Sequence, residues 1–596
     1  MARLSHLSDA DLSHSSQLPD MDLRQEPTGH RAIRERKATG AHYTPSTLAG
    51  FVAKNLVGAW PEGAKRTDLS ILDPASGDGE LLLSALTELS HHGFSDFRAY
   101  GFDTDPSAVE FTAERLRNAF PLVPISIEDE SFIEFVLWNA SGDLFSNPER
   151  ANFDLVIANP PYVRTQVLGA KRAQSLAKQF GLTGRVDLYH AFILGISRVL
   201  RPGGLACIIV SNRFMSTKAG EQVRRGILEI FDVLHVWDLG DTRLFEAAVL
   251  PAVLLLRRKD ERSPTGHPRF TSIYSTNESS PAQEINDAIE ALGTGGLVQL
   301  KDGSRFYVRH GELHHGEDPG GLWRLTNADV ASWLKTVASH THSRFGDIGK
   351  IRVGVKTNAD KIFIRSDWED LEGDMQPELL LPLITHHIAR RFKSHPVLPE
   401  KKVLYPHEIM RGKRRAVELS QYPKSEKYLL RYKEILEGRE YLMKGGRKWY
   451  EIWVPQNPDN WALPKLVFRD IAAEPTFWVD LTGSVVNGDC YWLAFEDQDR
   501  LDLLWLTLAV GNSSFIVEFY DRMFNNKLYA SRRRFMTQYV EQFPLPDPKT
   551  PTAKKIISEA QKIYKQLPSA STEIQEANVD QLVWQAFGLP FEEVGR

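Results

Sequence analysis

The feature that most constrains the fold is an alternation of short apolar runs with amphipathic segments over residues 39–258. Runs that are apolar at nearly every position are typical of strands buried on both faces. Amphipathic helices are expected between them, for example at 107–119 and 188–200. This alternation predicts an α/β fold with a doubly wound, mainly parallel sheet. The expected strands are 69–73, 97–102, 153–158, 205–210, 233–239 and 250–258.

The domain organisation follows from length and local composition, because 596 residues are too many for one core. Residues 1–38 are polar and lack periodicity, so we expect an extension there, and the α/β domain occupies 39–262. Residues 263–322 are polar and turn-rich, which favours a linker or peripheral connection. Residues 323–550 are rich in Trp, Tyr and Arg and predict a second, mixed α+β domain. The remainder, 551–596, is expected to be helical.

Composition excludes several classes of protein. The two cysteines, Cys207 and Cys490, form no CxxC pair, which favours a reducing, cytoplasmic setting. No uninterrupted apolar stretch predicts a membrane span, and the N-terminus does not resemble a secretory signal. The eighteen histidines show no persuasive metal spacing, so no metal is expected. A net charge of −5 argues against a uniformly basic DNA-coating protein but allows a local basic face.

A glycine-containing turn, "ILDPASGDGELLL", follows the first expected strand. Asp73 ends that strand, and Ala75, Gly77 and Gly79 lie in the turn. Glycine lets the backbone approach a ligand closely, and open α/β sheets bind ligands at this edge. The spacing matches neither GxGxxG nor GxxxxGK[ST], so a dinucleotide or phosphate loop is not indicated. An acid at the strand end suits a cationic ligand better than a pyrophosphate.

Further polar residues follow the other expected strands. Asp103, in "GFDTD", is placed to accept hydrogen bonds from a ribose diol, although a helix N-cap is the alternative. "GDLF" contributes Asp143, with Leu144 beside it, as an acceptor for an adenine amino group; a loop Asp in a turn is nearly as good an explanation. Thr44, in "TGAHYTP", could close over the other end of the ligand. Together these residues fit S-adenosyl-L-methionine better than NAD.

The strand at 153–158 ends in "NPPY". An exocyclic amine on an aromatic base is a poor nucleophile, because its lone pair is delocalised. The Asn159 side-chain oxygen and the Pro160 carbonyl could accept hydrogen bonds from its two N–H groups, which would free the lone pair for methyl transfer. Tyr162 supplies a stacking face for a base that has left the duplex. Phe245 is a candidate second wall, and its alternative is a core Phe.

These motifs resemble, in the same order, the gamma-class (Taq-type) adenine-N6 DNA methyltransferases of restriction–modification systems. The resemblance covers roughly 39–258 and rests on "TGAHYTP", "LDPASGDG", "FDTD", "GDLF", "NPPYV", "GRVDLYHAFILGISRVLRPGG" and "LFEAAVLPAVLLL". It implies a class I S-adenosylmethionine-dependent methyltransferase (Rossmann-like) sheet of seven strands, the last antiparallel. It implies cofactor contacts at Thr44, Asp73, Asp103 and Asp143, catalysis by Asn159, Pro160 and Tyr162, and stacking of the flipped adenine by Phe245.

The C-terminal half resembles the target-recognition domain of this family more loosely. Its implied partners are double-stranded DNA and a separately encoded restriction endonuclease. Two basic clusters could hold phosphates, although each could be a solvated charged loop. Their residues are Arg411, Lys413, Arg414, Arg532, Arg533 and Arg534. A protein glutamine methyltransferase, an RNA adenine methyltransferase and a non-catalytic DNA-recognition subunit stay open as alternatives.

Overall fold

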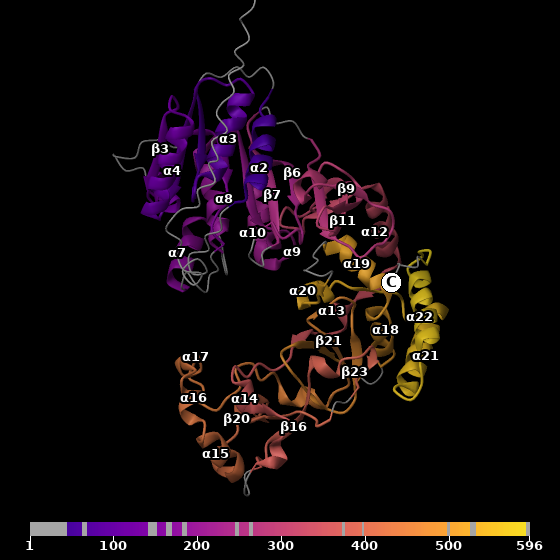
Figure 1. The fold of residues 1–596 in the computed structure, drawn as a ribbon. Coiled ribbons are helices and arrows are strands. Elements are labelled where there is room, and N and C mark those ends of the chain that lie inside the picture. Colours follow the sequence, from indigo (N-terminus) through magenta and orange to yellow (C-terminus); the bar gives the residue numbers. More distant parts are fainter. Residues whose placement is uncertain are drawn as a thin grey trace, which may run out of the picture.

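The computed structural model describes residues 44–61, 68–140, 152–162, 170–181, 187–244, 250–261, 266–371, 376–395, 398–496, 501–524 and 532–591. The ribbon is C-shaped, with an N-terminal lobe built on a large sheet and a C-terminal lobe of smaller sheets and helices (Figure 1). The lobes meet where α9 (Arg213–Ser216) approaches α20 (Thr537–Val540). There the Ser216 and Tyr539 hydroxyl oxygens lie 3.3 Å apart.

Seven strands of the N-terminal lobe lie in the order β3-β2-β1-β4-β5-β7-β6. Only β7 is antiparallel to its neighbours, β5 and β6. The expected α/β fold, with a seven-stranded methyltransferase-type sheet and an antiparallel last strand, is therefore confirmed. The bounds are β1 Leu69–Asp73, β2 Phe97–Asp103, β3 Ile125–Asp129, β4 Phe153–Ala158, β5 Leu200–Ser211, β6 Phe231–Asp238 and β7 Pro251–Arg258.

Helices cover both faces of this sheet because its strands are apolar on both sides. In β4, Leu155 and Ile157 join the core beneath α2, α3 and α4, whereas Val156 and Ala158 join the core beneath α5, α8 and α10. All four side chains are fully buried. The bounds are α2 Ser46–Gly58, α3 Glu80–His91, α4 Pro106–Ala119, α5 Phe132–Ala140, α7 Ala170–Gln179, α8 Leu188–Val199 and α10 Glu221–Ile230.

Within 263–322, predicted as a linker or peripheral connection, the structure has regular secondary structure at the edge of the sheet. Four further strands and α11 (Ala288–Ala291) lie in this region, and β12 follows just after it. The sheet continues as β6-β8-β11-β10-β9, with β12 paired to β11. β11 reads "RFYVRHGELH", in which the buried residues Phe306 and Val308 are separated by an exposed one. This short alternating pattern is hard to recognise in the sequence, because polar segments flank the strands of this region. The bounds are β8 Arg269–Ser275, β9 Gln283–Ile285, β10 Gly296–Leu300, β11 Arg305–His314 and β12 Arg324–Thr326.

The C-terminal lobe is built on a five-stranded sheet, β14-β25-β21-β23-β17, and a four-stranded sheet, β15-β18-β16-β24. The two-stranded pairs are β13–β27, β19–β20 and β22–β26. The strand bounds are β13 Ser343–Arg344, β14 Arg352–Val353, β15 Ile364–Arg365, β16 Leu380–Ile384, β17 Phe392–Lys393, β18 Lys402–Leu404, β19 His407–Met410, β20 Lys413–Ala416, β21 Lys465–Arg469, β22 Ile471–Ala472, β23 Phe477–Asp480, β24 Val485–Val486, β25 Cys490–Ala494, β26 Arg533–Arg534 and β27 Pro544–Leu545.

In this lobe α12, α13, α18, α19, α21 and α22 share a core with one face of the five-stranded sheet, whereas α14, α15 and α16 share a core with its other face. Among the described residues no single helix is long and apolar enough to span a membrane; α18 and α19 together pass by length and composition, but they are bent by 72°. The bounds are α12 Ala328–His340, α13 Phe345–Ile348, α14 Asp360–Phe363, α15 Pro423–Leu430, α16 Lys433–Glu437, α17 Glu440–Lys444, α18 Leu501–Gly511, α19 Ser514–Phe524, α21 Pro551–Gln566 and α22 Glu573–Ala586.

Candidate functional site

Asp73 lies fully buried at the end of β1. Its Oδ1 accepts a hydrogen bond from the Ala75 amide at 3.0 Å, whereas no group of the described protein bonds to its Oδ2. Burial, with smaller contributions from Asp103 and Asp78, raises the pKa of Asp73 to about 8. A buried carboxylate with one oxygen unused suits a ligand that brings positive charge and N–H donors.

The glycine turn is tied to the end of β2. Gly77 and Gly79 have φ of 53° and 77°, a region that glycine adopts without steric cost. The Gly77 amide donates to Asp103 Oδ2 at 2.9 Å, and the Asp105 amide donates to Asp103 Oδ1 at 2.9 Å. The cap of α4 is Asp105, not Asp103, because its side chain accepts from the Ser107 amide. Asp103 therefore fixes the turn and keeps lone pairs for a ligand.

The "NPPY" segment lies at the tip of β4, next to β1 in the sheet. The Asn159 side-chain amide donates to the Thr44 hydroxyl at 3.1 Å, although 115 positions separate the two residues. Thr44 is buried and stands just before α2, which packs against the sheet. The structure thus brings the Thr44 motif into contact with the tip of β4, a contact that was not predicted from the sequence.

A second tyrosine, Tyr189, lies beside Tyr162 and was not predicted from the sequence. The rings of Tyr162 and Tyr189 have centroids 6.4 Å apart and are tilted by 51°. Tyr189 is buried in the first turn of α8, and burial raises the pKa of both phenols, so both stay neutral. The sequence feature that could have indicated Tyr189 was "DLYHAF", which places aromatic residues at the start of an apolar helix.

A buried polar network, also not predicted, joins the ends of β5, β6 and β8. The Asn212 amide donates to Asp238 Oδ1 at 3.0 Å, and the Tyr274 hydroxyl donates to Asp238 Oδ2 at 2.7 Å. Burial raises the pKa of Asp238 to about 6, although these hydrogen bonds act in the opposite direction and lower it. The network lies at the same edge of the sheet as the tip of β4 and the glycine turn, and it holds the ends of the strands there together.

Three predicted site residues, Asp143, Leu144 and Phe245, lie outside the described residues. Their roles stay predictions. Among the described residues, no group of three or more His, Cys, Asp and Glu side chains is placed to hold a metal ion.

The first basic cluster lies on the β19–β20 hairpin. Arg411 stands at its tip with φ of 52°, and Lys413 and Arg414 follow it; all three are exposed. Arg414 also donates to the Gln456 carbonyl at 3.0 Å. This cluster is accessible, as a phosphate contact requires.

The three arginines of the second basic cluster differ in exposure. Arg532 is exposed, but Arg533 is only 8% exposed and forms two 2.7 Å hydrogen bonds to the Asp521 carboxylate. Arg534 pairs with Asp470 at 3.1 Å. The prediction of a phosphate contact is therefore corrected for Arg533, because its guanidinium is buried and bound inside the lobe.

The chain is similar in sequence to known proteins. Residues 98–245 match the Eco57I restriction-modification methylase family. The chain is 36% identical over 580 residues to the type II methyltransferase M.BanIII of Aneurinibacillus aneurinilyticus, covering 95% of this chain and 99% of that protein. It is 24% identical over 540 residues to the type II methyltransferase M.BstVI of Geobacillus stearothermophilus, covering 86% and 91%. A cryo-EM structure of a DrdV–DNA complex aligns with a TM-score of 0.49 at 13% identity, covering 89% of this chain and 57% of that chain.

Proposed function

Because the chain belongs to the Eco57I-family type II DNA methyltransferases of restriction–modification systems, we propose that it methylates the N6 amine of an adenine flipped out of duplex DNA. The methyl donor of this class of enzyme is S-adenosyl-L-methionine. The observation that carries the proposal is the Thr44–Asn159 contact at the tip of β4, one strand from Asp73. The resulting modification would protect host DNA from a separately encoded endonuclease.

The residues of the glycine turn fit this cofactor. The unused oxygen of Asp73 would accept from its amino group, and Asp103 would accept from its ribose. Asp143 and Leu144 keep their proposed place beside its adenine. When bound, the cofactor supplies an electrophilic sulfonium methyl group. The turn packs closely on α4, because a Cβ on Gly79 would lie 2.7 Å from Thr112 Cγ2.

The strand tip would activate the amine of the target base. In the observed orientation the Asn159 N–H group is directed at Thr44, so the carbonyl oxygen occupies the other arm of the amide. That oxygen and the Pro160 carbonyl would accept hydrogen bonds from the two amine N–H groups, which localises the nitrogen lone pair toward the methyl group. One proton would leave the nitrogen after methyl transfer. Tyr162 would stack on the base, and Tyr189 would hold the Tyr162 ring in place. Phe245 keeps its proposed role as the second wall.

The decisive experiment is single-turnover methylation of duplex DNA with labelled cofactor, followed by identification of the modified nucleoside. N6-methyladenine is expected from the wild type. Asn159→Ala should lower the rate by about a hundredfold or more, because the variant lacks a preorganised acceptor at the reacting amine. DNA affinity should stay unchanged in this variant, since phosphate contacts dominate it.

A matched control is Asn118→Ala, at an exposed position of α4. Transfer RNA and a glutamine-containing release-factor peptide test the two other methyl acceptors. N4-methylcytosine as the product, preferred methylation of RNA or peptide, or a wild-type rate in Asn159→Ala would contradict the proposal. Cofactor binding without methylation of any substrate would favour a recognition subunit instead.

A further inference from the structure

Three side chains of the C-terminal lobe form an exposed ledge, defined here as Asn358, Tyr441 and Trp453. Tyr441 and Trp453 are each 40% exposed as residues, and their rings meet edge to face with centroids 4.8 Å apart. The Asn358 side-chain amide donates to the Tyr441 hydroxyl at 2.9 Å. Adjacent exposed aromatic rings are typical of recognition surfaces rather than of ordinary protein surface.

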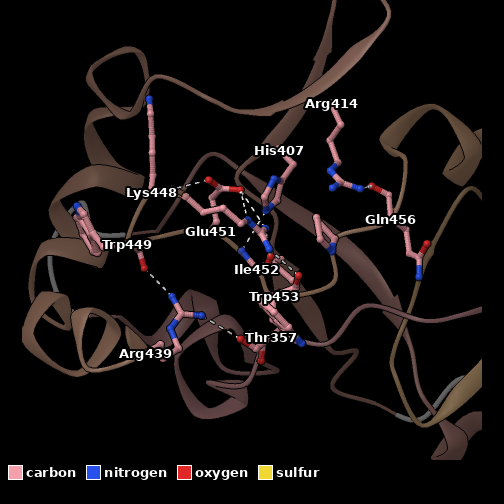
Figure 2. A network of polar contacts seen from close by, with 12 residues as sticks. Thr357, His407, Arg414, Arg439, Lys448, Trp449, Glu451, Ile452, Trp453 and Gln456 are labelled. Atoms are coloured by element: carbon pink, nitrogen blue, oxygen red, sulfur yellow. Dashed lines mark hydrogen bonds and ion pairs between the residues drawn. The ribbon is translucent and has the colours of Figure 1, made fainter. Parts of the chain in front are cut away.

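The backbone beneath Trp453 is held rigidly. The Arg447 guanidinium donates to the carbonyls of Trp453 and Ile452 at 2.7 and 2.6 Å. The Ile452 amide donates to His407 Nε2 at 3.0 Å (Figure 2). Burial lowers the pKa of His407 to about 3, so this imidazole stays a neutral acceptor throughout the physiological pH range. Trp453 is thus exposed on a fixed support and not on a loose loop.

The other two members of the ledge share that support. Lys356 and Val454 exchange backbone hydrogen bonds of 3.1 and 2.9 Å, which joins the Asn358 segment to the Trp453 segment. Buried Arg439, just before α17, donates to the carbonyls of Thr357 and Trp449 at 3.0 and 2.6 Å (Figure 2). The ledge is therefore preorganised, and binding would cost little conformational entropy.

The surroundings of the ledge suit nucleic acid. Lys356, Arg411 and Lys413 are exposed, and within the described part of the chain they form no ion pair. His407 and Arg414 connect the β19–β20 hairpin to the Ile452–Gln456 backbone, so the hairpin adjoins the ledge. Figure 1 shows α17 at the inner edge of the C-shaped ribbon, on the side toward the N-terminal lobe.

We propose that this ledge reads bases in the major groove of the target duplex, with Asn358 as a specificity-determining residue. The inference rests on the proposed function and adds the residues that select the sequence. The Tyr441 hydroxyl engages one N–H of Asn358, so the Asn358 oxygen and second N–H both stay available to a base edge. That donor–acceptor pair matches the N6 and N7 groups of adenine, and a two-stranded hairpin fits the major groove.

The test maps methylated positions on genomic DNA and measures kcat and KM on duplexes that differ at single positions. Asn358→Gly removes the side chain without strain at its φ of 53°, and Asn358→Asp keeps the size but removes the N–H donors. Both should lose discrimination at one base position by roughly 5- to 150-fold. Tyr441→Phe should cause a smaller loss at the same position, since the amide is no longer oriented. Trp453→Phe, which keeps a ring, should retain more discrimination than Trp453→Ala.

The matched control is Ile574→Ala, an exposed apolar side chain on α22, away from the inner edge of the ribbon (Figure 1). Thermal melting and cofactor affinity, measured in parallel, identify any variant that fails to fold, and the variants that fold then decide the result. Unchanged recognition sequence and unchanged kcat/KM in folded Asn358→Gly and Trp453→Ala would overturn the inference. Failure of the wild type to methylate DNA would overturn the proposed function instead, so the two failures are distinguishable.

Discussion

Asp73 links cofactor binding to pH through a single buried carboxyl. With a pKa of about 8 and no ligand, it is mostly protonated at pH 7. A cationic ligand favours the carboxylate and therefore lowers this pKa, so binding near pH 7 releases a proton. The affinity for S-adenosyl-L-methionine should accordingly rise as the pH increases from 6 toward 8 and level off above the pKa of the free protein.

Titration calorimetry in buffers of different ionisation enthalpy measures that proton release directly. Asp73→Asn should bind the cofactor more weakly at pH 8, because it lacks the charge, and should lose the Asp73 part of the pH dependence. The cofactor's own titration is common to both proteins and cancels in the comparison. Equal proton release by the wild type and Asp73→Asn would show that this carboxyl does not face the ligand.

At the scale of elements, the strands that are apolar on both faces were predictable from sequence. β1 and β4 have the predicted bounds, because most of their positions are apolar and each run ends at a turn. Their internal polar residues, Ser70 and Asp154, are hydrogen-bonded to each other. β3 was missed, since "ISIED" lies at the sheet edge and its side chains are only partly buried or exposed. In the candidate site, the positions of Asp73 and Asn159 at the ends of β1 and β4 were predictable from the sequence. The Thr44–Asn159 contact and the partners of Arg533 were not, because they depend on packing between distant segments.

The turn after β5 yields a prediction about stability. Arg224 of α10 is 2% exposed, and its guanidinium donates to the carbonyls of Phe214, Thr217, Gly320 and Gly321. Arg224→Met would leave these buried acceptors unsatisfied, which should lower the stability of the N-terminal lobe by about 3 kcal/mol or more.

Thermal or denaturant unfolding of the purified variant measures this destabilisation. The control is Arg225→Met, which removes an exposed side chain paired with Asp318 and should change stability by less than about 1 kcal/mol. Similar unfolding midpoints for the two variants would mean that the Arg224 hydrogen bonds contribute little.

At the scale of the whole molecule, DNA affinity should depend on exposed basic residues only. Replacing Arg411, Lys413 and Arg532 with Gln should weaken binding and flatten the salt dependence by about 0.9 log unit for each phosphate that the variant no longer neutralises. Arg533→Gln should instead lower thermal stability, because it leaves Asp521 buried without this partner guanidinium.

Fluorescence anisotropy over a series of salt concentrations gives the slope of log affinity against log salt. A control variant carries Gln at Lys554 and Lys555, two exposed positions of α21. An unchanged slope after replacement of Arg411, Lys413 and Arg532 would place the duplex on another face.

The C-shaped arrangement also has a topological consequence. The lobes meet on one side, near Ser216 and Tyr539, and the ribbon is open on the other (Figure 1). A protein of this shape can engage a duplex from the side and needs no free end to thread. Covalently closed circles and chromosomes are therefore as accessible as linear fragments, and the enzyme can leave a modified site without opening a ring of protein.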